Sequence, residues 1–134
     1  MTCTSCDGPL VRFAVPAAVR EHAPEETSVA AICADCLDVT SATGDPPETP
    51  GFVRIDDAFP TGEGGAAFAL LVGTLPSVTM RKDAAVALRA HAERSGVDVH
   101  LAFDRLIAAS ERGALDPAFD LARRVRQFES LVDE

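Results

Sequence analysis

The sequence predicts an α+β protein in which a small N-terminal ribbon carrying four cysteines precedes a bundle of three or four helices. Three observations lead to this prediction. All the cysteines fall in two C-x-x-C pairs near the N-terminus, β-prone runs connect the pairs, and the second half of the chain carries apolar residues at helical spacing. We divide the chain into a ribbon at 1–40, a proline- and glycine-rich linker at 41–51 and a helical domain at 52–134.

The two pairs are Cys3/Cys6 and Cys33/Cys36. The spacing within each pair lets two thiolates from one tight turn face the same ion, and four sulfurs complete a tetrahedral site for Zn²⁺. We therefore predict a zinc ribbon in which these four cysteines bind one structural Zn²⁺ ion. An excursion at 16–27 accounts for the long spacing between the pairs. So short a ribbon has little apolar surface, and we expect the metal to supply much of its folding free energy.

Two other uses of the cysteines stay open. Iron can occupy the same sulfur cage, although such modules usually have an aromatic-rich core and this segment has only Phe13. A redox dithiol would need a lowered thiol pKa, whereas Asp7, Asp35 and Asp38 flank the cysteines and are expected to raise it. His22 is a further candidate ligand, but four sulfurs already fill the site.

Local patterns predict the elements of the ribbon. Runs at 10–15 and 28–32 are β-prone, and Val39 begins a third candidate strand. Pro16 suits the start of a helical turn between them. Gly8, two places after the second cysteine, suits a tight turn with positive φ.

The centre of the chain predicts a buried helix. The β-prone run at 52–55 allows a short strand, either on the ribbon or against the helices. The glycine-rich stretch at 62–65 reads as a turn into a helix rather than a phosphate site, because Glu63 would repel an anion. Residues 66–75 are apolar on every face, which indicates a central helix, and Gly73 is expected to end it before Pro76.

Three more helices are expected after residue 76. Ser77 or Thr79 is the predicted cap of a helix that ends near Gly96. Residues 97–103 alternate as a strand would, but helical spacing continues to Ile107, so we predict a helix capped by Asp98. Asp116, followed by proline, is the predicted cap of the last helix.

The composition is strongly acidic, with 21 acidic and 12 basic residues and a net charge of −9. Lys82 is the only lysine. Such a surface suits a salt-filled cytosol, where repulsion between carboxylates is screened within about 3 Å at 1 M salt. The alternative is that the chain is an ordinary acidic protein.

No apolar run reaches the roughly 18–20 residues of a membrane span, so we expect a cytoplasmic protein without membrane contact.

No catalytic triad, nucleotide-binding motif or paired catalytic carboxylates are recognisable, so we predict a non-catalytic adaptor with a protein partner, and the oligomeric state stays open. His91 reads as a polar-edge residue, and a deep polar pocket around His91 or His100 would instead favour an enzyme. The alternative is a nucleic-acid-associated factor that uses Arg123, Arg124 and Arg126, although the ribbon itself is acidic. A third hypothesis is a redox- or metal-sensing switch.

The whole chain resembles small haloarchaeal proteins of unassigned function. The resemblance rests on the four cysteines and on the stretches FPTGEGG at 59–65, GVDV at 96–99, DRL at 104–106 and FDL at 119–121. The resemblance implies that the four cysteines bind zinc and that the protein works in a salt-rich cytosol. It implies no particular activity, because the family has no assigned function.

Overall fold

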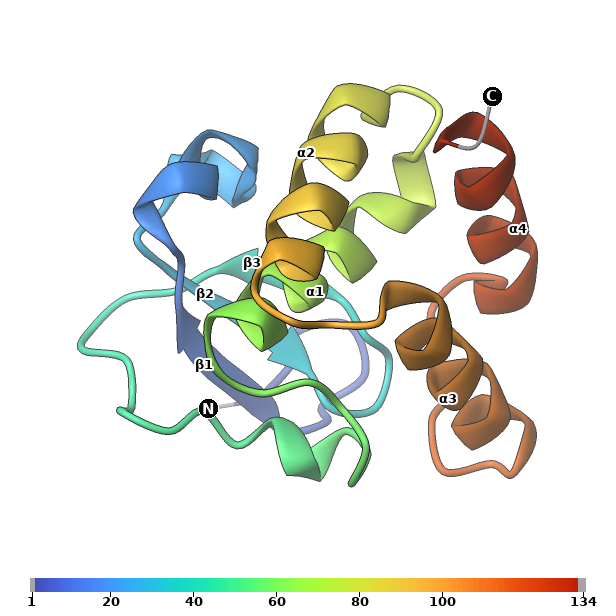
Figure 1. The fold of residues 1–134 in the computed structure, drawn as a ribbon. Helices are drawn as coiled ribbons and strands as arrows, with labels where there is room; N and C mark the ends of the chain where they lie inside the picture. The colour runs from blue at the N-terminus through green and yellow to red at the C-terminus, as the bar shows by residue number, and fades with distance from the viewer. Residues whose placement is uncertain (1, 133–134) are drawn as a thin grey trace.

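The computed structural model describes residues 2–132 and confirms the α+β fold. Met1 and residues 133–134, the outer ends of the predicted ribbon and helical domain, lie outside the described residues. A three-stranded antiparallel sheet is followed by four α-helices (Figure 1). The strands are β1 (Leu10–Ala14), β2 (Val29–Cys33) and β3 (Val39–Ser41), and the helices are α1 (Gly62–Thr74), α2 (Lys82–Arg94), α3 (Val99–Glu111) and α4 (Leu121–Val132).

The sheet has the order β1-β2-β3 and confirms the three predicted strands. Its central strand β2 is buried along its whole length. The register with β1 sets Leu10 opposite Cys33, so the strand pairing ends at the second cysteine pair. Between β1 and β2, the predicted helical turn is a 3₁₀ helix at Ala17–His22, which buries Val19.

Helix α1 is the central helix, and residues 64–72 are all buried, as predicted. The prediction that Gly73 ends the helix is wrong, because α1 continues to Thr74. Gly73 instead permits close approach to β3: a Cβ at this position would lie 2.8 Å from the Cβ of Val39. The absence of a side chain therefore serves packing between helix and sheet rather than termination.

Helix α3 confirms the prediction of helix rather than strand for residues 97–103. The carboxylate of Asp98 caps it by accepting a hydrogen bond of 3.0 Å from the amide of Leu101. Gly96 has a φ of +94°, which confirms the left-handed turn predicted at the end of α2.

The starts of α2 and α4 differ from the predictions. A 3₁₀ turn at Leu75–Ser77 precedes α2, which begins at Lys82 without a side-chain cap. Helix α4 begins at Leu121, and Asp120 caps it through a bond of 3.2 Å from the amide of Arg123. Asp116 is not a cap: it lies five residues before the helix begins, and its backbone amide is bonded to the carbonyl of Asp35.

The short strand allowed at 52–55 does not form, and Phe52–Arg54 is instead a single 3₁₀ turn. This turn points the ring of Phe52 into the core, where it lies between Phe13 of β1, at 5.5 Å, and Phe59, at 5.1 Å. Burial of a large aromatic side chain therefore outweighs the local β-propensity.

One row of aromatic rings connects the sheet with the last helix. Successive ring centroids lie 4.9–5.6 Å apart, and the members are Phe13, Phe52, Phe59, Phe68, Phe103 and Phe128. The sheet and the helices thus share one apolar core. Consequently, the N-terminal sheet has more apolar interior than its own residues provide. Within residues 2–132, no helix combines the length and apolar character needed to cross a bilayer.

Candidate metal centre

The structure brings together the four cysteines predicted to bind metal. Their Sγ atoms all lie within 4.8 Å of one another. Cys3 Sγ is 3.7 Å from Cys36 Sγ, and Cys6 Sγ is 3.4 Å from Cys33 Sγ. A tetrahedron with Zn–S bonds of about 2.3 Å has edges of about 3.8 Å, so these separations fit a single ion among the sulfurs. All four cysteines are free of disulfides.

The first cysteine pair lies in a compact turn, residues 3–8, which we call the first knuckle. The amide of Cys3 donates to the carbonyl of Gly8 at 2.8 Å, and the amide of Asp7 donates back to the carbonyl of Cys3 at 2.9 Å. These two backbone bonds close the turn and direct both sulfurs to its inner side.

The second pair repeats this geometry in residues 33–38, the second knuckle, which joins β2 to β3. The amide of Cys33 donates to the carbonyl of Asp38 at 2.9 Å, and the amide of Leu37 donates to the carbonyl of Cys33 at 3.1 Å. Each bond has its equivalent in the first knuckle. Two turns of the same shape therefore face each other across the sulfurs.

The residue with positive φ in each knuckle is the one directly after the second cysteine. Asp7 has a φ of 62° and Leu37 a φ of 66°. The prediction that Gly8 supplies the positive φ is wrong. Gly8 is needed for space, since a Cβ there would lie 2.7 Å from Oδ2 of Asp35 in the opposite knuckle.

Backbone amides surround the sulfurs with partial positive charge. The amide of Ser5 donates to Cys3 Sγ, and the amides of Asp35 and Cys36 donate to Cys33 Sγ, each at 3.4 Å. Such bonds stabilise thiolates rather than thiols. The knuckles therefore offset part of the negative charge that four thiolates would gather at one ion.

The thiols differ in their readiness to ionise. Burial works to raise the pKa of Cys3, but hydrogen bonds from the amides of Ser5 and Cys6 and from neighbouring thiols outweigh it and lower the pKa to about 7. Burial raises the pKa of Cys36 well above its ordinary value, and the neighbouring thiols add to this. The backbone hydrogen bond from Asp38 works against the rise in the pKa of Cys36, and the charges of the flanking aspartates, which we expected to raise the thiol pKa, cause neither shift. A divalent cation would bind by displacing the remaining protons.

Exposure separates one ligand from the other three. Cys3, Cys33 and Cys36 are at most 3% exposed, whereas Cys6 is exposed. Leu10 is the apolar residue that packs against the buried sulfurs. The cluster therefore lies at the surface of the molecule, and solvent reaches it at Cys6.

The three histidines lie on helices and pair with carboxylates. His22, the further candidate ligand, lies 3.8 Å from Glu21. His91 is buried, contrary to the prediction of a polar-edge residue, and its Nε2 lies 2.8 Å from Glu63 at the start of α1.

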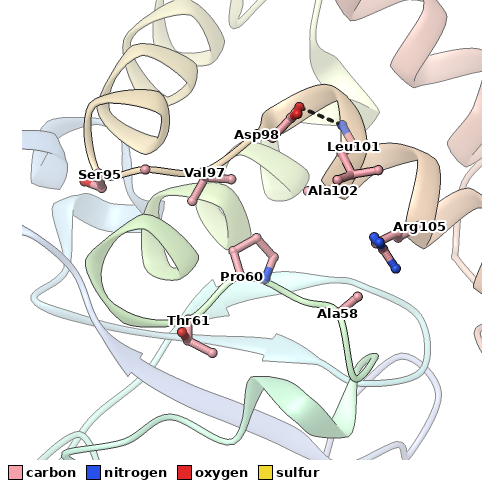
Figure 2. A pocket seen from close by; sticks show the side chains of 10 residues that line it. Ala58, Pro60, Thr61, Ser95, Val97, Asp98, Leu101, Ala102 and Arg105 are labelled. Atoms are coloured by element: carbon pink, nitrogen blue, oxygen red, sulfur yellow. Dashed lines mark hydrogen bonds between the residues drawn. The ribbon is translucent and has the colours of Figure 1, made fainter.

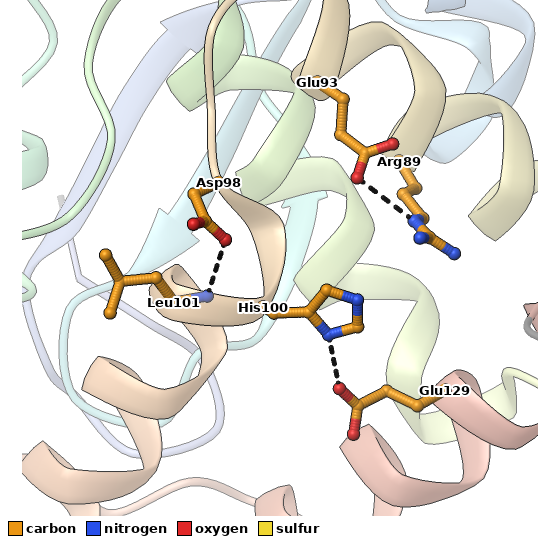
Figure 3. Close-up of polar contacts among 6 residues, drawn as sticks. All are labelled: Arg89, Glu93, Asp98, His100, Leu101 and Glu129. Atoms are coloured by element: carbon orange, nitrogen blue, oxygen red, sulfur yellow. Dashed lines mark hydrogen bonds and ion pairs between the residues drawn. The ribbon is translucent and has the colours of Figure 1, made fainter.

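On the outer side of the helices, His100 Nδ1 lies 2.6 Å from Glu129 Oε2 and links α3 to α4 (Figure 3). The sequence does not reveal this pair or the His91 pair, because their members lie 28 or 29 positions apart.

The predicted basic cluster lies on α4. Arg123 and Arg126 are exposed, while Arg124 is half-buried and donates to Gln127 Oε1 at 3.0 Å. Gln127 in turn donates to Thr79 Oγ1 at 2.9 Å. One of the three arginines therefore belongs to a contact that positions α4, and the other two are exposed on its surface.

A cavity of about 350 Å³ lies between residues 58–61 and the turn that joins α2 to α3 (Figure 2). Three of the stretches that carry the resemblance, at 59–65, 96–99 and 104–106, meet around it. Its charged lining residues are Asp98 and Arg105, and the Asp98 carboxylate caps α3.

A family model matches residues 2–132, and it describes a family of unknown function, DUF6276. The chain belongs to this family. No curated protein and no solved structure matches it. The DUF6276 match includes both knuckles and all four helices of the described chain, so the family is defined over the cysteine cluster and the helices together.

Proposed function

We propose that Cys3, Cys6, Cys33 and Cys36 hold one structural Zn²⁺ ion and that this DUF6276 protein is a non-catalytic adaptor. The observation that carries the proposal is the closeness of four sulfurs from two matching knuckles. Four protein ligands complete a tetrahedral site and leave no position for water or substrate, as is typical of structural zinc. The ion, when bound, would fix the two knuckles relative to each other.

The surroundings of the sulfurs favour zinc over iron. The apolar residue packed against them is Leu10, whereas the rings of the aromatic row run from Phe13 towards the helices. The aromatic-rich core usual in iron-binding cages of this type is therefore not built around this cluster. Zinc also has no redox chemistry and no preferred geometry beyond the tetrahedron that these turns supply.

Metal analysis of the purified protein tests the site. We expect one zinc per chain, and Co²⁺ in its place should give the intense thiolate-to-cobalt absorption of a four-sulfur site at one equivalent. Cys33→Ser should weaken this absorption and the affinity, whereas Ser5→Ala, which keeps its amide bond to Cys3, should change neither. Fully folded protein that takes up neither metal would contradict the proposal, and bound iron would contradict the choice of zinc.

The adaptor role rests on the closed site and on the charge of the chain. With no open coordination position, the protein would act through its surface. A net charge of −9 favours a protein partner with a basic face, because complementary charge steers association. The composition also supports a salt-adapted cytoplasm, where thiols stay reduced and available to metal.

Pull-downs from cell extract at molar salt test this role. We expect a partner that metal-loaded protein retains and that chelator-stripped protein loses, with Cys36→Ser behaving as the stripped form. No reproducible partner under these conditions would count against an adaptor. Salt-sensitive binding of RNA or DNA that is lost in Arg123→Glu/Arg126→Glu protein would instead support the nucleic-acid alternative.

A further inference from the structure

The connection between α3 and α4, residues 113–119, lies against the second knuckle, and we call it the strap. The amide of Asp116 donates to the carbonyl of Asp35 at 2.8 Å, and the amide of Ala118 donates to the carbonyl of Cys36 at 3.1 Å. Two successive carbonyls of the metal-binding turn are thus bonded to the strap. These bonds explain why Asp116 is not the cap of α4.

The strap also fixes the start of α4. Leu115 is 4% exposed and anchors the strap in the core. Phe119 packs against the same core, and it lines a small cavity together with Leu37 of the second knuckle. Helix α4 begins at Leu121, so its first turn lies only three residues beyond the bond from Ala118.

The same strap borders the exposed ligand. A cavity of about 300 Å³ is lined by Cys6, Asp35 and residues 113–116. Since Cys6 is the exposed one of the four ligands, this cavity is the side from which a competing chelator reaches the sulfurs. The strap forms one wall of that approach.

Helix α4 depends on its contacts with the rest of the protein. It has 12 residues, and helices shorter than about 12–15 residues are marginal in water on their own. Its buried side chains are those of Leu121, Val125 and Phe128. Its polar links, such as the one between His100 and Glu129, are largely exposed and therefore individually weak (Figure 3).

We propose that metal binding and the docking of α4 are coupled through the strap. The bound ion holds the second knuckle in the conformation that accepts the two strap bonds, and the docked strap restrains that knuckle and shields Cys6. This inference rests on the proposed metal site. Coupling of this kind is reciprocal: the factor by which bound metal strengthens docking equals the factor by which the docked state binds metal more tightly than the undocked state. Loosening α4 enough to populate the undocked state must therefore weaken metal binding. The metal centre thereby regulates the C-terminal helix.

The test is the release of Co²⁺ from the full-length protein to excess EDTA, followed by the thiolate-to-cobalt absorption. Val125→Ala loosens α4 without touching a knuckle. Val99→Ala is the matched control, because Val99 is equally buried but begins α3, at the end of that helix away from the strap. We expect faster release in Val125→Ala, by about fivefold when the lower end of typical coupling falls wholly on the dissociation rate, and unchanged release in Val99→Ala.

A second pair of variants addresses the strap bonds directly. Ala118→Pro removes the amide that donates to Cys36 and should also speed release, whereas Asp116→Asn keeps its amide and should not.

Hydrogen exchange on the wild-type protein needs no variant: removing the metal should speed exchange in the strap and α4 but not in α2. Equal release rates in all variants, or unchanged protection of α4 without metal, would overturn the coupling. Failure to take up Co²⁺ at all would overturn the proposed metal site as well.

Discussion

Two backbone positions determine the shape of the knuckles that carry the four cysteines. Asp7 and Leu37 occupy the same place in their turns, and both have positive φ, which disfavours residues that carry a Cβ. Leu37 is fully buried, so packing compensates for the strain. Asp7 is exposed and has no such compensation beyond the tolerance of aspartate for this conformation.

We therefore expect Asp7→Gly to be neutral or stabilising by up to about 1 kcal/mol, since glycine adopts positive φ without a steric penalty. Gly8→Ala, one residue later, should cost about 1–3 kcal/mol, because its Cβ would collide with Asp35 of the opposite knuckle. Urea unfolding of metal-loaded protein measures both changes. The reverse order of stability would show that the knuckles are not shaped as described.

At the scale of elements, the sheet and the central helix pack closely where the helix carries a glycine. Gly73 of α1 lies against Val39 of β3, so closely that a Cβ added to Gly73 would be only 2.8 Å from the Cβ of Val39. This contact brings the central helix onto the strand that follows the second knuckle. Packing at this point therefore restrains the strand that follows the second knuckle.

Gly73→Ala should destabilise the protein by about 1–3 kcal/mol through overpacking. In the double variant Gly73→Ala/Val39→Ala, the smaller partner makes room for the new methyl group, so the combined loss should be less than the sum of the two single losses. A double-mutant cycle in urea measures this coupling. Strictly additive losses would mean that the two residues do not share a tight contact.

The cap of α4 provides another test at this scale. Asp120→Ala should cost about 1 kcal/mol, because it leaves the amide of Arg123 without its partner. Asp116→Ala, in contrast, should leave the helix intact, since Asp116 contributes its backbone amide to the strap. Thermal unfolding of the two variants distinguishes these roles, and a larger loss for Asp116→Ala would restore it as the cap.

For the whole molecule, the continuous core changes what metal removal should do. Because the ring of Phe13 in β1 lies 5.5 Å from that of Phe52, the sheet is supported by the helical part as well as by the sulfurs. A ribbon on its own would depend on the metal for its folding. Here the dependence should be confined to the knuckles and the segments bonded to them.

We expect chelation at neutral pH to leave most of the helical circular dichroism in place, with exchange protection kept in α1, α2 and α3, while the amides of Asp7 and Leu37 lose protection from exchange. Residual metal should be checked by elemental analysis in the same sample. Complete loss of helical signal on chelation would show that the shared core is insufficient and that the metal governs global folding.

The local parts of this protein follow from short-range patterns. The two C-x-x-C pairs identify the clustered residues because ligand spacing within a tight turn is a local property. The capping of α3 by Asp98 and the burial of α1 follow in the same way from neighbours in the chain. The starts of α2 and α4 do not follow, because in each case local preference competes with distant contacts.

By itself, the sequence determined the α+β class, the three strands, the helical character of 97–103 and the identity of the clustered cysteines. Only the tertiary structure decided that Gly8 and Gly73 serve close packing, that Phe52 joins a ring row and that the strap is bonded to the second knuckle. The physical reason is that turns and helix periodicity depend on residues a few positions apart. The close contacts of Gly8 and Gly73 and the strap bonds, in contrast, join residues 27 to 82 positions apart, and no local propensity encodes them.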